Sequence, residues 1–423
     1  MLRAHGQLNQ PRSARPHIMC TAYILLWFPV PTETFIFREV VNLRRMGLPV
    51  RVFTIYGRRR RNLSAEMRAA STDVERLGWR SLSSAVGAIW YWWRRKPDVV
   101  KELFSAIRVL KWQHLEKSAE SILALLASFE LARRFEAQNI QHIHAPWASG
   151  CATAAWAAAK LTGRPFSFTA RAWDIYPPDE LIDQKIRDAV LVRTETEANR
   201  RHLAAFADGK LEKFHVTYNG LPLRADRNAT VAMQPPYQLL AIGRFVRKKG
   251  FDQLLYAAKL LADAGVDFRL TIAGDGMLRW PLKWLASYLD IADRVHFPGF
   301  TPHDAVADLF VASDIFIMPC VIAPSGDRDG LPTVILEALA YCLPVVTTPV
   351  SGIPELIEDG VTGLLVRERD PPAIAAAIRR LIADRDAALS LGGRGRMRVS
   401  QQFDPERNHR IVLELYHQIV QPK

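Results

Sequence analysis

One stretch, Ser325–Val366, constrains what this chain can fold into more than any other. It begins with a polar loop, Ser325–Pro332, which a buried element would not tolerate, and continues into a segment rich in Ala and Leu, Thr333–Leu343. A short β-branched run between prolines follows, and a glycine turn then leads into another apolar run. The order loop, helix, strand, loop and strand predicts one half of an open α/β sheet.

Two carboxylates stand out in this stretch, Asp329 in the loop and Glu337 inside the helical segment. If the helix starts near Pro332, its N-terminus carries free backbone N–H groups and a positive dipole, which suit an anion such as a phosphate. A carboxylate among apolar neighbours is costly unless it has partners. Glu337 therefore either binds the vicinal hydroxyls of a sugar or accepts backbone N–H groups from a neighbouring loop.

A second group of polar residues lies in YQLLAIGRFVRKKGFDQLLYAAKLL, which predicts a strand, a short loop and an amphipathic helix. Gly243 allows a tight turn, and Arg244 and Lys249 then stand immediately before the helix. Two cations beside a helix N-terminus are the electrostatics that a diphosphate needs, although cations in loops are often simply solvated. The turn Gly274-x-Gly276, between a strand and a helix, is also typical of a nucleotide site.

These motifs resemble the retaining glycosyltransferases of family 4, which have the GT-B fold, and the resemblance extends from about Ile18 to Tyr416. Asp329 and Glu337 match the family's pattern of Glu, seven residues and Glu, with Asp329 one methylene shorter than the usual acid. The segment GRFVRKKG matches G-R-x-x-x-x-K-G, so the resemblance gives Arg244 and Lys249 the role of clamping the nucleotide diphosphate. It implies further donor contacts for Gly274, Phe297, Gly330, Leu331 and Pro332.

The resemblance also implies a fold class, α/β of the GT-B type, with two Rossmann-like doubly wound domains facing each other across a cleft. The expected boundaries are a flexible extension at 1–17, an acceptor-binding domain at 18–223 and a linker at 224–236. A nucleotide-sugar-binding domain at 237–402 and a C-terminal helix at 403–423, which returns to the first domain, complete the chain. The length of 423 residues suits two or three domains, and the linker is polar and contains prolines.

Two motifs of the first domain predict acceptor contacts. Thr32 and Glu33, which look like an N-cap and a first helical turn, lie in a loop similar to the P-x-x-S/T-E-T-F loop of bacterial exopolysaccharide glycosyltransferases. In that family the loop faces the cleft where the acceptor sugar enters. FSFTARAWDIY is similar to FS-x-TAHA-x-DIY, which makes Arg171 and Asp174 acceptor-binding candidates. Arg171 stands where His is usual, and its permanent charge predicts a charged acceptor group.

Neither a metal nor a cofactor is expected. His142 and His144 alternate on a predicted strand and face the same way, but no acid or Cys nearby completes a ligand set. By resemblance, His144 hydrogen-bonds the donor sugar beside the reacting carbon; the other interpretation is a structural His bonded to backbone. The triplet Asp327–Asp329 has the form of a metal-binding DxD, yet Arg244 and Lys249 already supply positive charge for a diphosphate, and the resembled fold works without metal.

The net charge of +13 is unevenly placed. Residues 1–233 carry 35 Lys and Arg against 21 Asp and Glu, and the remaining residues carry 21 against 22. A basic half indicates a polyanionic surface as partner. Arg58–Arg61 and the aromatic-basic segment Ala88–Lys96 favour anionic lipid over nucleic acid, because Trp and Tyr beside cations suit a membrane interface. The alternative for the second segment is a helix that faces the core and has a solvated basic end.

The expected location is the cytoplasm, at the inner face of the cytoplasmic membrane. The four cysteines are far apart and form no CxxC pair, which fits a reducing compartment. No stretch approaches 18 apolar residues, so the sequence predicts no transmembrane helix.

The predicted function is a retaining, metal-independent glycosyltransferase of the hexosyltransferase type. It would move a sugar from a UDP- or GDP-sugar to a lipid-linked saccharide in cell-surface polysaccharide biosynthesis, with His144, Arg244, Lys249 and Asp329 as catalytic candidates. The cations would stabilise the leaving diphosphate. Two alternatives stay open. A nucleotide-sugar epimerase of the same fold needs extra carboxylates in the first-domain cleft, and a basic nucleic-acid-binding protein predicts salt-sensitive binding.

Overall fold

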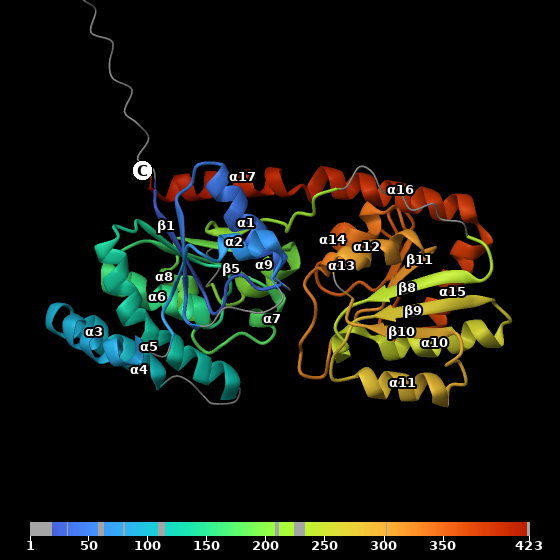
Figure 1. Ribbon diagram of the computed structural model, residues 1–423, viewed down its shortest axis with the longest axis horizontal. Helices are drawn as coiled ribbons and strands as arrows, with labels where there is room; N and C mark the ends of the chain where they lie inside the picture. The colour runs from blue at the N-terminus through green and yellow to red at the C-terminus, as the bar shows by residue number, and fades with distance from the viewer. Residues whose placement is uncertain are drawn as a thin grey trace, which may run out of the picture.

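The computed structural model describes residues 19–31, 33–57, 63–78, 81–108, 115–207, 211–223, 233–301 and 303–420. The expected extension 1–17, the acceptor candidate Thr32, the basic run Arg58–Arg61 and most of the expected linker lie outside these ranges. The described residues form two α/β domains that lie side by side, with the last two helices running along one edge of both (Figure 1). This arrangement confirms the predicted fold class.

The first domain is built on a parallel sheet with the strand order β3-β2-β1-β4-β5-β6-β7. Its strands are mostly buried apolar runs, as expected for a parallel sheet covered on both faces. The order reverses beside β1, which pairs with β2 on one side and with β4 on the other, so a ligand crevice is expected at the carboxyl ends of β1 and β4. The strands are β1 Thr21–Leu25, β2 Val50–Thr54, β3 Val74–Arg76, β4 His142–Ala145, β5 Phe166–Ala170, β6 Leu191–Thr194 and β7 Phe214–Val216.

Helices cover both faces of this sheet. The Ala-rich α6 is almost fully buried, because its small side chains allow close packing against α5 and the sheet. The helices α3 and α4 lie at the lower left of the molecule in Figure 1, away from the second domain. The helices are α1 Thr34–Arg45, α2 Ala65–Ala70, α3 Ser81–Arg95, α4 Pro97–Ile107, α5 Leu115–Ala137, α6 Gly150–Thr162, α7 Ala172–Ile175, α8 Ile182–Asp188 and α9 Glu197–Ala204.

The second domain has a parallel sheet with the order β10-β9-β8-β11-β12-β13, which reverses between β8 and β11. Its strands are β8 Tyr237–Ile242, β9 Phe268–Ala273, β10 Val295–Gly299, β11 Ile315–Met318, β12 Val345–Thr347 and β13 Leu364–Leu365. The turn η1 Arg247–Lys249 precedes the first helix. The helices are α10 Phe251–Asp263, α11 Arg279–Tyr288, α12 His303–Val311, α13 Thr333–Ala340, α14 Ile353–Leu356, α15 Pro371–Ala383 and α16 Arg385–Gln402.

The last helix, α17 Pro405–Val420, lies along the first domain and packs against α1 (Figure 1). Val412 and Tyr416 are fully buried in an apolar cluster with β1 and α1. His409 Nδ1 lies 2.9 Å from the Asn42 amide nitrogen, and the Tyr416 hydroxyl lies 2.9 Å from that of Tyr23. The C-terminal segment therefore joins the two domains. Among the described residues, none of the helices combines the length and apolar character that crossing a bilayer requires.

Candidate functional site

Two buried lysines hold the acidic loop of the second domain. Lys249 Nζ lies 2.7 Å from Asp329 Oδ2, and Lys248 Nζ lies 2.9 Å from Asp327 Oδ1 and 3.6 Å from Asp329 Oδ1. Burial alone would raise the pKa of Asp329, but Lys249 and Lys248 outweigh it and lower that pKa. The structure thus brings together Lys249 and Asp329, which the sequence placed in one site. It adds Lys248, which was missed although it is the first lysine of the KKG motif.

Arg244 is exposed and lines a cavity that the first domain otherwise forms. The backbone beneath it is tightly packed. Gly274 has φ +140°, and an added Cβ would stand 1.9 Å from the Gly243 carbonyl oxygen, so this turn requires glycine. The Gly274 N–H donates to the Gly299 carbonyl at 2.9 Å, and Phe297 packs at 6.2 Å from the Phe245 ring. Gly274 and Phe297 therefore fix the carboxyl ends of β8, β9 and β10 beside Arg244.

Glu337 lies on α13, partly buried, and burial raises its pKa to about 7. Arg38 of α1, in the first domain, is the charge that opposes this shift, so the carboxylate is within the field of the other domain. No hydrogen bond joins the described residues to the Glu337 carboxylate, in contrast with the alternative in which a loop supplies N–H groups. Its oxygens remain available to a ligand.

The loop between Asp327 and α13 lies against the first domain. An added Cβ on Gly330 would stand 3.3 Å from Ala172 Cβ, and the Gly330 carbonyl accepts the Gly352 N–H at 2.8 Å. The Arg328 guanidinium lies 4.4 Å from the centre of the Tyr176 ring, also across the domain boundary. Gly330 therefore has a packing role at this boundary. Pro332 is the buried N-cap of α13, and Leu331 packs on the second-domain core.

Glu355 of α14 also crosses to the first domain. Its carboxylate accepts the backbone N–H groups of Glu197 at 2.8 Å and Ala198 at 2.9 Å, the first two residues of α9. The Tyr218 hydroxyl donates to the same carboxylate at 3.0 Å. Sequence reasoning missed this contact, because it depends on residues more than 130 positions apart.

Arg171 and Asp174 are buried within the first domain. The Arg171 guanidinium pairs with Glu195, donates to the Pro146 carbonyl at 3.1 Å and to Asn219 Oδ1 at 3.1 Å, and lies 4.3 Å from the centre of the Phe35 ring. Since its donors are engaged inside the protein, the geometry gives no support to the expected charged acceptor group at Arg171.

Asp174 binds backbone N–H groups of its own domain. It accepts the Arg171 N–H at 2.8 Å and the Ala148 N–H, and burial raises its pKa to about 6 despite these bonds. It therefore ties the start of α7 to the loop after β4.

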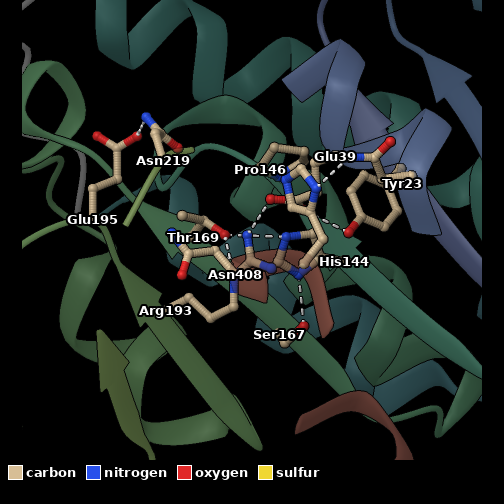
Figure 2. Close-up of polar contacts among 12 residues, drawn as sticks. Tyr23, Glu39, His144, Pro146, Ser167, Thr169, Arg193, Glu195, Asn219 and Asn408 are labelled. Atoms are coloured by element: carbon tan, nitrogen blue, oxygen red, sulfur yellow. Dashed lines mark hydrogen bonds and ion pairs between the residues drawn. The ribbon is translucent and has the colours of Figure 1, made fainter. Parts of the chain in front are cut away.

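His144 is fully buried and both of its ring nitrogens are occupied (Figure 2). Nδ1 lies 2.7 Å from the Ser167 hydroxyl, and Nε2 lies 3.2 Å from the Thr169 hydroxyl. The Tyr23 and Tyr416 rings cover it at 4.8 Å and 5.4 Å between centroids. Burial and nearby cations hold its pKa well below the usual range, so it is neutral. This environment corresponds to a structural His, and it is hydroxyl groups rather than backbone that bind it.

Glu33 lines a cavity of about 530 Å³ at the carboxyl ends of β1 and β4, where the strand order reverses. The Trp147 indole N–H donates to Glu33 Oε2 at 3.4 Å. Apart from Arg244, sequence reasoning did not find the other residues of the lining, although Glu116 and Glu120 are four residues apart and so share one face of α5. The cavity is lined by Leu25, Leu26, Trp27, Glu33, Phe35, Tyr56, Glu116, Glu120, Trp147, Ser149, Cys151, Trp173 and Arg244.

Comparisons with known proteins bear on both domains. Residues 224–398 match the family model described as Glycosyl transferases group 1. The chain is 33% identical over 210 residues to a putative colanic acid biosynthesis glycosyltransferase of Salmonella typhimurium, covering 49% of this chain and 52% of the relative. It is 33% identical over 209 residues to the amylovoran biosynthesis glycosyltransferase of Erwinia amylovora, covering 49% of this chain and 51% of the relative. The chain thus spans about half the length of these curated relatives.

A more distant relative and two solved structures extend the comparison. A GDP-mannose-dependent alpha-(1-6)-phosphatidylinositol monomannoside mannosyltransferase of Mycobacterium tuberculosis is 30% identical over 241 residues, covering 55% of this chain and 63% of the relative. Anabaena HepE in complex with UDP superposes with a TM-score of 0.67 at 17% identity, over 95% of this chain and all of that chain. Sucrose-phosphate synthase from Thermosynechococcus elongatus superposes with a TM-score of 0.70 at 18% identity, over 95% of this chain and 99% of that chain. These structures show the fold, two Rossmann-like domains of the GT-B type.

Proposed function

We propose that this chain is a retaining glycosyltransferase of family 4. It moves a sugar from a nucleotide-diphosphate sugar to a saccharide acceptor in exopolysaccharide biosynthesis, without a metal ion. The observation that carries the proposal is the position of Arg244 and Lys249. They lie at the switch between β8 and β11 in the segment that matches a glycosyltransferase family, and Arg244 also borders the first-domain cavity.

The chemistry follows from the charges at this place. When the bond between sugar and phosphate breaks, negative charge grows on the departing nucleoside diphosphate, and fixed cations stabilise it. The Lys249 ammonium has three donors, so it can keep its 2.7 Å bond to Asp329 and still donate to a phosphate oxygen. Asp329 then holds Lys249 in place and accepts a hydrogen bond from a hydroxyl group of the donor sugar. Glu337, whose carboxylate has no hydrogen bond from the described residues, accepts the ribose hydroxyls.

Two features support the finer parts of the proposal. Asp327 and Asp329 are neutralised by Lys248 and Lys249, so the DxD sequence offers little net negative charge to a divalent cation. Retention is supported by the position of Arg244, which borders the same cavity as the acceptor candidate Glu33. The leaving group and the attacking hydroxyl then share one face of the sugar. Nuclear magnetic resonance of the product's anomeric proton tests retention directly, and inversion would refute it.

The donor is expected to be a UDP- or GDP-sugar. Anabaena HepE has been solved in complex with UDP and with UDP-glucose, and the mannosyltransferase of Mycobacterium tuberculosis is GDP-mannose-dependent. The test is a panel of both nucleotide classes, with a lipid extract of bacterial membranes as acceptor source and release of nucleoside diphosphate as the signal. Chelator should leave the rate unchanged.

Two variants and a matched control sharpen this test. Lys249→Ala and Arg244→Ala should each lower turnover by about 100-fold or more, since each removes a charge that meets the leaving group. Lys259→Ala, which breaks an exposed pair with Asp263 on α10, should turn over normally. Normal turnover by Lys249→Ala and Arg244→Ala, or no release from any donor, would refute the proposal.

The proposed location is the inner face of the cytoplasmic membrane, with a lipid-linked acceptor. On α3, Trp92 is buried and donates to the Phe129 carbonyl at 3.1 Å, whereas Trp90 and Trp93 are 61% and 45% exposed. The Arg94 guanidinium lies 4.6 Å from the centre of the Trp90 ring. The two interpretations of this segment thus apply to opposite faces of one helix, a packed face and an exposed aromatic-basic face.

The second domain adds a similar face on α11. Trp280, Trp284 and Tyr288 recur every four residues and are 66–72% exposed, and Lys283 lies 5.5 Å from the Trp280 ring. Both helices lie on the lower side of the molecule in Figure 1. Interfacial aromatics beside cations suit an anionic bilayer surface.

Sedimentation with vesicles that contain phosphatidylglycerol tests this location. A Trp280→Ser/Trp284→Ser variant should lose most of its binding, whereas Tyr256→Ser, at an exposed aromatic residue of α10, should bind as the wild type does. Equal binding by all three proteins would contradict the membrane contact.

One observation favours the epimerase as a second candidate. That alternative needs carboxylates in the first-domain cleft, and the cavity contains Glu33, Glu116 and Glu120. The two functions differ in product. An epimerase converts the donor sugar without any acceptor, whereas a transferase forms a new glycoside and releases nucleoside diphosphate in proportion to it. The nucleic-acid-binding alternative predicts salt-sensitive capture of RNA or DNA, with no turnover of a nucleotide sugar.

A further inference from the structure

The first-domain cavity combines aromatic walls with carboxylates. The Trp27 and Tyr56 rings stack at 4.7 Å between centroids and 29° between planes, and Trp147 meets Phe35 edge-on at 6.1 Å. Trp173 completes the aromatic lining and is 41% exposed. Flat aromatic surfaces pack against the C–H faces of sugar rings, while carboxylate oxygens accept sugar hydroxyl protons. The lining is therefore suited to a saccharide.

The charges of the lining are mostly negative. Glu33, Glu116 and Glu120 face one cation, Arg244, among the described residues that line the cavity. The same carboxylates act on two other side chains of the lining. Burial raises the pKa of the Cys151 thiol, and Glu120 and Glu33 raise it further. Burial also raises the pKa of the Tyr56 hydroxyl, and Glu120 and Glu116 add to that shift.

Two further cations lie behind the lining, where Lys117 interacts with Glu120 and Arg171 with Glu33, but their strongest bonds are made elsewhere. Lys117 lies 5.3 Å from the Trp173 ring, but its ammonium donates to the Pro177 carbonyl at 2.7 Å and to the Trp173 carbonyl at 3.4 Å. Arg171, under Phe35 and Trp147, is paired with Glu195. Arg244 is assigned to the diphosphate of the donor. An acidic sugar in the cavity would therefore meet three carboxylates, and the cation that shares the lining with them, Arg244, is the one assigned to the donor.

We propose that this cavity receives an acceptor sugar that carries no negative charge, a neutral or amino sugar, and that its carboxylates reject uronic acids and other acidic sugars. This inference rests on the proposed function, because it names the acceptor class of that same site. It differs from the prediction of a charged acceptor group, which was based on the permanent charge of Arg171. Like charges brought together in a partly desolvated site discriminate strongly between ligands of the same shape.

Three glycosides of equal shape test the proposal by binding. Octyl β-glucoside, octyl β-glucuronide and the methyl ester of the glucuronide are titrated into the full chain below their micelle concentrations. The titration uses low salt and pH 8. The glucoside and the ester should bind with similar affinity, and the glucuronide should bind about tenfold more weakly or worse. Equal or tighter binding of the glucuronide would overturn the proposal, as would failure of all three to bind at millimolar concentration.

Matched variants locate the discrimination. Glu116→Gln keeps the shape of an exposed side chain and removes one charge, so it should reduce the discrimination against the glucuronide several-fold. Glu212→Gln makes the same change at an exposed residue before the edge strand β7, which is three strands from β4, and should leave the discrimination unchanged. An unchanged discrimination in both Glu116→Gln and Glu33→Gln would contradict the role of these carboxylates.

The outcome can be told apart from that of the proposed function. Release of nucleoside diphosphate from a donor, together with preferred binding of the glucuronide, would leave the transferase in place and refute the acceptor class. Discrimination against the glucuronide without turnover of any nucleotide sugar would leave a saccharide site in place and refute the transferase.

Discussion

Replacing Glu355 by alanine should loosen the junction between the two domains at one identifiable place. The Glu355 carboxylate accepts hydrogen bonds from the backbone N–H groups of Glu197 at 2.8 Å and Ala198 at 2.9 Å. The Thr196 hydroxyl accepts a hydrogen bond from the backbone N–H of Asn199 at 3.1 Å. The first turn of α9 thus has its N–H groups satisfied from both domains. Without Glu355 the first two become unpaired at the positive end of a helix.

The expected magnitude follows from those two bonds. A hydrogen bond to a charged group contributes about 1.5 kcal/mol or more, which we reduce to about 1 kcal/mol each because Glu355 is partly exposed. A loss of about 2 kcal/mol should speed hydrogen exchange of the Glu197 and Ala198 amides roughly 30-fold. Glu355→Gln, which keeps one carbonyl oxygen and loses the charge, should give an intermediate effect.

Amide hydrogen exchange resolved to single residues measures this change. The Asn199 amide is the internal reference, since its bond to Thr196 is untouched. Unchanged exchange at Glu197 and Ala198 would refute the reasoning. An equal acceleration across the whole first domain would also refute it, because that would indicate global destabilisation rather than release of one helix end.

Three further predictions concern stability. Burial raises the pKa of Glu337 from 4.5 to about 7, so the folded state binds more protons than the unfolded chain between these values. The stability of the wild type relative to Glu337→Gln should therefore fall by roughly 3 kcal/mol as the pH rises through this window. Parallel pH profiles would contradict this. Arg193→Met leaves the buried Glu39 carboxylate without its 2.7 Å partner and should cost about 3–5 kcal/mol in urea unfolding, more than the double change with Glu39→Gln. Gly393→Ala has open space on α16 and should stabilise by about 0.5–1 kcal/mol, whereas Gly392→Ala, whose Cβ would stand 1.9 Å from a carbonyl oxygen, should destabilise; melting curves distinguish the two.

The fold class was readable from sequence because its signals are local. Apolar runs between prolines and glycines predicted buried strands, and the alternation with helices predicted open parallel sheets. The positions of Lys249 before a helix and of Asp329 in a polar loop were also visible, although their ion pair joins residues 80 positions apart. Only the resemblance to a family placed them in one site.

The surroundings of His144 and Arg171 were decided by tertiary structure. Both occur in segments with a clear motif, but the Tyr416 ring of the last helix covers His144, and Glu195 and Asn219 enclose the Arg171 guanidinium. Figure 2 shows this buried network, in which Tyr23 donates to Glu39 at 2.8 Å and Arg193 pairs with Glu39 at 2.7 Å. A motif records which residue follows which; it does not record which distant side chain will cover it.

The sequence by itself therefore determined the elements, their alternation and the cations that precede a helix, because hydrophobic period, glycine turns and helix ends are properties of neighbouring residues. Only the tertiary structure decided which polar groups remain open to a ligand. Burial and pairing depend on contacts such as that between Tyr23 and Tyr416, 393 positions apart. The carboxylates of the first-domain cavity belong to the same class, since a loop after β1 and a face of α5 meet only when the sheet forms.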